Sequence, residues 1–223
     1  CAITNVLLAI DVLSPSMIWS VPLDNTISSI VSTDEVVLTA TPDMVIAYNV
    51  QTGEPVWQRI LLDGIRTSLV LADQALVLGT ESGQFLSLDV LDGKLLWSHN
   101  PPKDQPCSAF FTEGALITST TEGVIQRLDP FSAELLWTYD PGVLEDGTCP
   151  GLVSADGFLY LAGSGGSLRA LDIHSGTEVW SFALEQNKYN TLALSHDKLV
   201  LPVKPDELVF FTSASNPSLT PTP

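Results

Sequence analysis

The five tryptophans of this 223-residue chain recur at nearly equal intervals of 38, 40, 40 and 43 residues. Eight residues before each lies a polar residue that follows an apolar one. The tryptophans are Trp19, Trp57, Trp97, Trp137 and Trp180, and their polar companions are Asp11, Asn49, Asp89, Asp129 and Asp172. A period near 40 residues is typical of stacked or radially repeated units, so the chain is expected to fold as a repeat protein.

Each repeat is predicted to consist of four short strands. In residues 64–97, apolar runs rich in Val and Leu are interrupted by Gly, Asp, Ser and Gln, and no helical periodicity is present. The same pattern occurs in residues 27–57, 104–137 and 150–180. Four antiparallel strands in about 40 residues form a β-propeller blade. The near-continuous apolar runs of the inner two strands favour burial on both faces.

The turn between the third and fourth strands explains the polar companions. Gly53, Gly93 and Gly176 lie four residues after the Asp or Asn, where a left-handed backbone favours glycine. Pro15 and Ala133 take this place in the other copies, so those turns are expected to differ in geometry. The Asp carboxylates are expected to accept hydrogen bonds from turn amides, and each Trp to dock on the adjoining blade. These motif residues are therefore predicted to be structural.

The segments LDVLDGKLLW and LDIHSGTEVW resemble the PQQ-like β-propeller repeat of quinoproteins and their relatives, and five copies cover nearly the whole chain. The resemblance implies an all-β propeller of four-stranded antiparallel blades. Quinone-dependent relatives bind the quinone and Ca²⁺, with an acidic base and often adjacent cysteines. This sequence has no adjacent cysteines and no evident Glu, Asn and Asp cluster beside a Trp platform. It is closer to the β-barrel assembly lipoproteins of the family, which lack the quinone.

The chain ends predict how the ring closes. Residues 1–23 supply only the last strands of a blade, and residues 186–213 supply the first strands of one. Joining them completes a fifth blade, closed by strands from both termini, in a single domain over residues 1–212. Residues 213–223 are Pro/Ser/Thr-rich and are predicted to be a tail or linker. The rival interpretation is a fragment or an open arc with exposed apolar blade faces.

The three cysteines indicate in which cellular compartment the protein is found. Cysteine at the mature first position is what bacterial lipoproteins carry, so lipidation of Cys1 is expected, although the alternative is a chain that merely starts there. The apolar run from Asn5 leaves little flexible tether. Cys107 and Cys149 lie at near-equivalent places in neighbouring repeats, and either a disulfide or two buried thiols fits the sequence.

The net charge of the chain limits the classes of partner it can bind. With 26 acidic and 9 basic residues, the net charge of −17 disfavours nucleic acid and anionic membranes. No apolar run reaches the ~18 residues of a membrane span. The three histidines are dispersed without metal-ligand spacing. The expected partners are other envelope or membrane proteins, with membrane contact only through a lipid anchor.

Two irregular connections interrupt the repeat, at residues 99–107 and 138–151. The longer one holds Asp140, Glu145 and Asp146 and is the candidate partner-binding loop, because loops that depart from a scaffold often carry binding. A solvated loop is favoured there over a weak Ca²⁺ site. The leading hypothesis is a non-enzymatic, lipid-anchored protein of the bacterial cell envelope, without catalytic residues, metal or cofactor. It would act as a protein-binding scaffold or an accessory subunit of a membrane complex. The alternative is a PQQ- or small-molecule-binding enzyme, or its degenerate relative.

Overall fold

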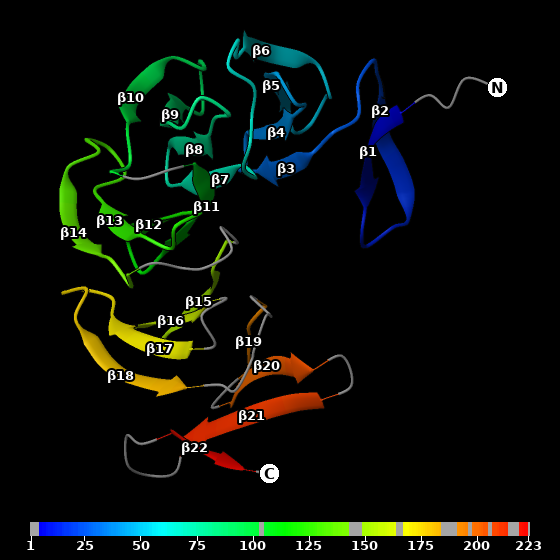
Figure 1. Cartoon of the computed structure of the whole chain (residues 1–223). Helices are drawn as coiled ribbons and strands as arrows, with labels where there is room; N and C mark the ends of the chain where they lie inside the picture. Colours follow the sequence, from blue (N-terminus) through cyan, green and yellow to red (C-terminus); the bar gives the residue numbers. More distant parts are fainter. Residues whose placement is uncertain are drawn as a thin grey trace. The chain divides into compact units, whose positions relative to one another are not determined.

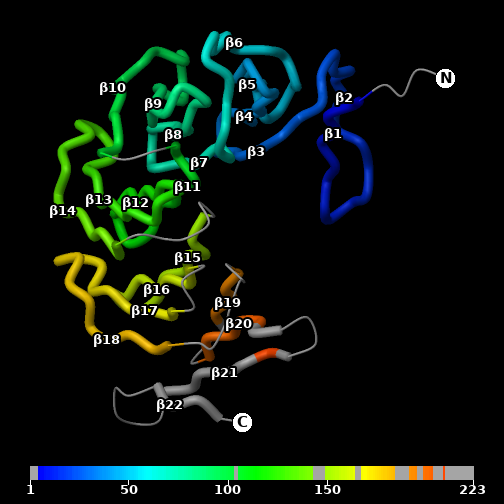
Figure 2. The backbone as a smooth tube through the Cα atoms, in the orientation of Figure 1, coloured from blue at the N-terminus to red at the C-terminus, as the bar shows by residue number. Residues whose placement is uncertain are grey.

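The structure, a computed structural model, describes residues 5–102, 105–142, 149–163, 167–183, 191–195, 198–204, 207–213 and 219–222. Every regular element in these ranges is a β-strand, and all the observed pairings are antiparallel between neighbours in the chain. Figure 2 follows the backbone from one sheet to the next in chain order. The all-β architecture of four-stranded antiparallel sheets predicted from the repeat is confirmed.

The first compact unit comprises Cys1–Pro101 with Ser108–Phe111 and Pro130–Ala133. It begins with a two-stranded sheet and continues with two four-stranded sheets (Figure 1). The strands are β1 (Asn5–Asp11), β2 (Ser16–Leu23), β3 (Ser29–Ser32), β4 (Val36–Ala40), β5 (Met44–Asn49), β6 (Pro55–Ile60), β7 (Val70–Ala72), β8 (Ala75–Gly79), β9 (Phe85–Asp89) and β10 (Leu95–His99).

The second compact unit contains the remaining residues and most of three further four-stranded sheets. Their strands are β11 (Pro106–Thr112), β12 (Ala115–Thr120), β13 (Ile125–Leu128), β14 (Leu135–Tyr139), β15 (Gly151–Ala155), β16 (Phe158–Gly163), β17 (Ser167–Asp172), β18 (Glu178–Ala183), β19 (Ala193–Ser195), β20 (Lys198–Lys204), β21 (Glu207–Ser213) and β22 (Leu219–Thr222). The single domain expected over residues 1–212 stays a prediction.

The second strand of a sheet is its most buried element. Every residue of β4, β8 and β12 is buried, as the sequence indicated for the inner strands of each repeat. In one cluster Leu38 and Val45 pack with Leu76 and Leu88 of the next sheet. Burial of this apolar area is the main stabilising contribution, at roughly 25 cal/mol per Å².

The tryptophan motif docks each sheet on the following one. Four indole Nε1–H groups donate to the carbonyl of the residue after the next motif's Asp or Asn. These bonds run from Trp19 to Val50 (2.9 Å), from Trp57 to Val90 (2.8 Å), from Trp97 to Pro130 (2.8 Å) and from Trp137 to Ile173 (3.0 Å). Trp180 packs beside Ala162 and Leu199 in the cluster between the last two sheets.

The glycines of the receiving turns have the left-handed backbone that the sequence indicated. Gly53, Gly93 and Gly176 have φ of 73°, 69° and 71°. A Cβ at Gly93 would lie 2.6 Å from Cε3 of Trp57, so the ring occupies the space that a side chain would need. Ala133 has φ of 58° and adopts the same conformation, which corrects the expectation that its turn would differ. Docking of Trp97 on Pro130 in this turn helps to offset the strain of about 1–2 kcal/mol.

The strand pairing at the chain ends corrects the predicted closure. β1 pairs only with β2, and β19–β22 form a sheet of their own, so no described sheet combines strands from both termini. The reason is that residues 219–222, within the expected tail, form β22 and pair with β21. This strand satisfies backbone groups along the edge of β21, and Pro221 is tolerated because β22 is an edge strand.

Candidate functional site

The polar residues of the repeat motif are committed to their own turns. The Oδ1 atom of Asp89 accepts the amide hydrogens of Leu91 (2.8 Å) and Asp92 (3.2 Å). Asp11, Asn49 and Asp172 accept the equivalent pairs of turn amides. The backbone N–H of Asp129 donates to Glu134 at 2.9 Å, as that of Asp89 does to Lys94 at 2.8 Å. The turns of Asn49, Asp89, Asp129 and Asp172 each receive a tryptophan of the preceding repeat, whereas the turn of Asp11 joins β1 to β2.

The backbone and hydroxyl donors of Ser175 lower the pKa of Asp172, and the amide of His174 adds to this effect. Since the carboxylate accepts all of these bonds, its ionised form is favoured. The low pKa is therefore a property of the structural turn.

The candidate partner-binding loop, residues 138–151, is described at both ends. Asp140 is exposed, and its Oδ1 accepts the amide hydrogen of Gly142 at 2.9 Å. Glu145 and Asp146 lie outside the described residues, as does Cys1. A disulfide joins Cys149 to Cys107 at the start of β11, with their Cα atoms 5.4 Å apart. Of the two alternatives that the sequence left open, the structure contains the bridge.

The bridge also ties the loop to the second irregular connection, residues 99–107. Gln105 in this connection accepts the amide hydrogen of Thr121 through its carbonyl, at 3.0 Å. Both irregular connections are therefore fastened to the sheet of β11–β14 at their C-terminal ends.

A three-residue polar cluster lies beside this loop. Arg169 of β17 donates to the Tyr139 hydroxyl at 2.5 Å and to Glu178 Oε2 at 3.3 Å. Tyr139, the last residue of β14, donates to the same carboxylate at 2.5 Å. The Tyr139 bond is the main cause that lowers the pKa of Glu178, and the Arg169 charge adds to it. Burial raises the pKa of Tyr139.

The spacing of the repeat motif does not predict this cluster. A signal existed, because Arg169 occupies a third-strand place where three of the four other repeats have an apolar residue, Leu8, Ile46 or Leu86, and the fourth has Gln126. A charged residue at an apolar position of a repeat indicates a partner, but the spacing does not reveal that Tyr139 and Glu178 supply it. The cluster links the strand before the loop to the following sheet.

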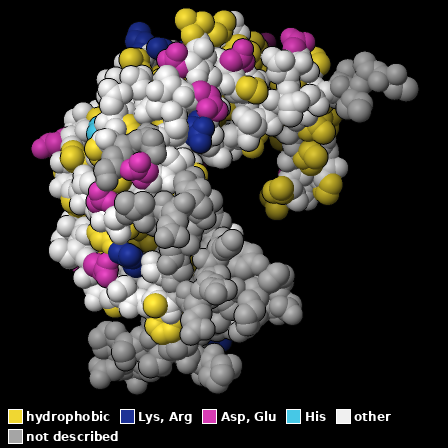
Figure 3. All heavy atoms as spheres, viewed as in Figure 1, with side chains coloured by type: hydrophobic (Ala, Val, Ile, Leu, Met, Phe, Trp, Pro, Cys, Tyr) yellow, Lys and Arg dark blue, Asp and Glu magenta, His cyan; other side chains and the backbone are white. Residues whose placement is uncertain are grey.

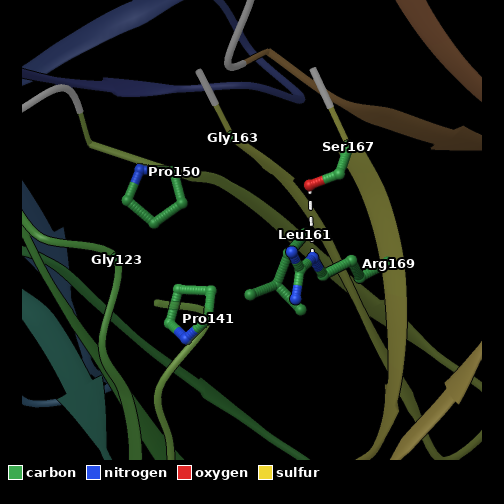
Figure 4. Close-up of a pocket in the computed structure, with 7 residues that line it drawn as sticks. All are labelled: Gly123, Pro141, Pro150, Leu161, Gly163, Ser167 and Arg169. Atoms are coloured by element: carbon green, nitrogen blue, oxygen red, sulfur yellow. Dashed lines mark hydrogen bonds between the residues drawn. The ribbon is translucent and has the colours of Figure 1, made fainter. Parts of the chain in front are cut away.

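A small cavity adjoins the cluster (Figure 4). Pro141, Pro150 and Leu161 line it together with Gly123, Gly163, Ser167 and Arg169, and Ser167 accepts a bond from Arg169 Nε at 3.2 Å. Its volume of about 20 Å³ suffices for a single water molecule.

The described residues do not fit a quinone with Ca²⁺. No group of three or more His, Cys, Asp or Glu within the described ranges is arranged to hold a metal ion. The indoles of Trp19, Trp57, Trp97 and Trp137 are held against turns by their hydrogen bonds, so they do not offer an open stacking platform. Among the described residues, no helix has the length and hydropathy that a membrane crossing requires.

Comparison with known proteins identifies the relatives of this chain. A family model described as outer membrane protein assembly factor BamB matches residues 4–110 and 100–217. The crystal structure of BamB from Moraxella catarrhalis is similar, with a TM-score of 0.75, 20% identity, and coverage of 93% of this chain and 64% of that chain.

Two computationally designed proteins are also similar. Ika8 gives a TM-score of 0.71 at 16% identity, covering 86% of this chain and 60% of its own. Ika4 gives 0.57 at 16%, covering 69% of this chain and 93% of its own. No curated protein sequence matches. At these identities the structures show the fold alone, a β-propeller of four-stranded blades, and the chain spans less than two thirds of the Moraxella protein.

Proposed function

The chain belongs to the family of the outer membrane protein assembly factor BamB, and on this premise we propose that it is a non-enzymatic protein-binding scaffold of the bacterial envelope. It serves as an accessory subunit of an outer membrane assembly complex. The observation that carries this proposal is the family match, which extends over residues 4–110 and 100–217.

The disulfide supports an extracytoplasmic location, because such bonds persist in oxidising compartments and are rare in the cytosol. Lipid on Cys1 would hold the protein at a membrane, and intact-mass measurement of the native protein tests this part. The expected result is a mass increase that disappears in Cys1→Ala. An unmodified Cys1 would contradict lipid anchoring and leave the scaffold role standing.

The partner contact is proposed at residues 138–151. Pro141 and Pro150 restrict the backbone at their own positions near the two ends of this segment, and the bridge ties Cys149 to Cys107 of β11. Asp140, Glu145 and Asp146 give the loop a negative charge that fits a basic partner surface.

The proposal includes neither catalysis nor a cofactor. It is supported by the commitment of the motif carboxylates to turn amides and by the poor fit of the described residues to a quinone site. Calorimetry with PQQ and Ca²⁺ tests this part, with no heat of binding expected. Stoichiometric binding would revive the small-molecule enzyme alternative.

Partner capture tests the contact. The double variant Glu145→Lys with Asp146→Lys should reduce co-purification of envelope proteins by about tenfold or more. Charges at the rim of an interface raise the association rate of oppositely charged partners, and close pairs of opposite charge add affinity. The matched control is Asp34→Lys with Glu35→Lys, a charge reversal of equal size in the turn before β4. Equal loss in both variants would show a non-specific charge effect, and unchanged capture in both would contradict the site.

A further inference from the structure

Arg169 lies beside both described ends of residues 138–151, the loop proposed above as the partner contact. Pro141 belongs to the first of these ends and Pro150 to the second, and both line the small cavity together with Arg169 (Figure 4). Asp140, just before Pro141, is exposed, and its Oδ1 accepts the amide hydrogen of Gly142 at 2.9 Å. Arg169 therefore lies at the base of this loop.

Three side chains hold Arg169 in this place. Its Nη1 donates to the Tyr139 hydroxyl at 2.5 Å and to Glu178 Oε2 at 3.3 Å, and its Nε donates to Ser167 Oγ at 3.2 Å. A guanidinium group carries its donors in a rigid planar fork, so several acceptors fix its orientation. The side chains of Arg169 and Glu178 are only 25% and 32% exposed, and water therefore screens their attraction less than that of a surface pair.

The positive charge of Arg169 is satisfied within the protein. The chain has nine basic residues against 26 acidic ones. Figure 3 shows the Lys and Arg side chains of the described residues in separate small groups on the face in view. The equivalent third-strand places of the other repeats carry uncharged residues, which are Leu8, Ile46, Leu86 and Gln126. The repeat therefore does not require an arginine at this place, and its role comes from the residues around it.

We propose that Arg169 is a positioning residue for the partner contact at residues 138–151, an inference that rests on the function proposed above. By holding the hydroxyl of Tyr139, the last residue of β14, it fixes the direction in which Asp140 leaves the strand. By lining the cavity with the two prolines, it also sets the separation of the described ends of the loop. Arg169 acts through these neighbours and not by contact with the partner.

Hydrogen exchange tests the positioning without any partner. Arg169→Met keeps a long unbranched side chain and removes every donor. The amide of Gly142, which donates to Asp140, should exchange about threefold faster or more in this variant, because loss of the hydrogen bonds of Arg169 lowers the free energy of local opening. The matched control is Arg59→Met in the other unit, where Arg59 donates to the carbonyl of Gly93 on the following sheet at 3.0 Å. It should leave the exchange of Gly142 unchanged.

Co-purification of envelope proteins tests the consequence for binding. Capture by Arg169→Met should fall by about threefold or more, within the range over which residues that touch no ligand modulate binding, and capture by Arg59→Met should equal that of the parent. Arg169→Lys keeps the charge but not the fork of donors, so it should restore part of the capture. Tyr139→Phe removes a single hydroxyl and should change exchange and capture in the same direction, which keeps the test decisive if Arg169→Met does not fold.

Two results would overturn the proposal. One is unchanged exchange at Gly142 in both Arg169→Met and Tyr139→Phe. The other is an equal loss of capture in Arg169→Met and Arg59→Met, which would show a general loss of stability. Failure of the proposed function looks different: the double charge reversal in the loop then leaves capture intact, while Arg169→Met still speeds exchange at Gly142. That outcome contradicts the partner contact and supports the positioning of Asp140 by Arg169.

Discussion

Substitution of Gly93 by alanine adds a single carbon atom, Cβ, and so tests whether the ring of Trp57 packs directly against this turn. Gly93 has φ of 69°, and a Cβ there would lie 2.6 Å from Cε3 and 2.8 Å from Cδ2 of Trp57. The left-handed backbone costs an alanine about 1–2 kcal/mol. Displacement of the ring adds about 1–3 kcal/mol, as overpacking of a well-packed site does. The free energy of unfolding should therefore fall by about 2–5 kcal/mol.

Gly114 separates the two costs. It has the same φ of 69°, but no atom lies within 4 Å of a Cβ placed there. Gly114→Ala should cost only the backbone strain, and the restriction of the unfolded chain is equal in both variants. Urea unfolding of the two variants should differ by about 1–3 kcal/mol at equal slope. Equal losses, within about 0.5 kcal/mol, would refute the argument that the ring fills this space.

Ala133 provides the reverse experiment, because it already has a left-handed backbone in the equivalent turn. Ala133→Gly removes the strain but frees the unfolded chain, so the net gain should be at most about 1 kcal/mol. A loss above about 1 kcal/mol in the same urea experiment would show that the Cβ of Ala133 makes a stabilising contact.

Three further measurements examine the second unit. Because the pKa of Asp172 is lowered in the folded protein, its carboxylate should stabilise the fold at pH values above the ordinary carboxyl pKa, and this stability should be lost as the pH falls through the folded pKa. The free energy of unfolding of the parent and of Asp172→Asn should therefore converge at acidic pH, and a difference that does not change with pH would contradict this. Tyr139→Phe should raise the pKa of Glu178 in an NMR titration by removing its main hydrogen-bond donor, and an unchanged pKa would contradict the cluster. Opening the Cys107–Cys149 bridge, which spans 42 residues, should cost about 4 kcal/mol by thermal or urea unfolding, and no loss would argue against a bridge in solution.

Periodic features were predictable from sequence because they are local and repeated. Trp57, Asp89 and Gly93 stand at fixed spacings, and one physical arrangement, an indole on a turn, accounts for all three. Five copies make the pattern visible without any structure. The prediction that the turn at Ala133 differs was wrong, because the left-handed backbone costs an alanine only about 1–2 kcal/mol, which the docking of Trp97 on this turn helps to offset.

Features that occur once were not predictable. Tyr139, Arg169 and Glu178 meet only because three strands of neighbouring sheets place them together. Composition predicts a tail or linker at residues 213–223. The strand β22 forms there because β21 offers an unpaired edge, and this edge arises only in the folded sheet. Whether Cys107 reaches Cys149 depends on a Cα separation that sequence does not encode.

The central claim, that this propeller chain acts by binding proteins through residues 138–151, is tested most directly by site-specific photo-crosslinking in the native envelope. A photoreactive residue at Asp140, in the loop, is compared with one at Leu62, which is 96% exposed in the other unit. If residues 138–151 bind a partner, position 140 should give a discrete crosslinked protein and position 62 should give none. Absence of a product at position 140, or the same products from both positions, would contradict it.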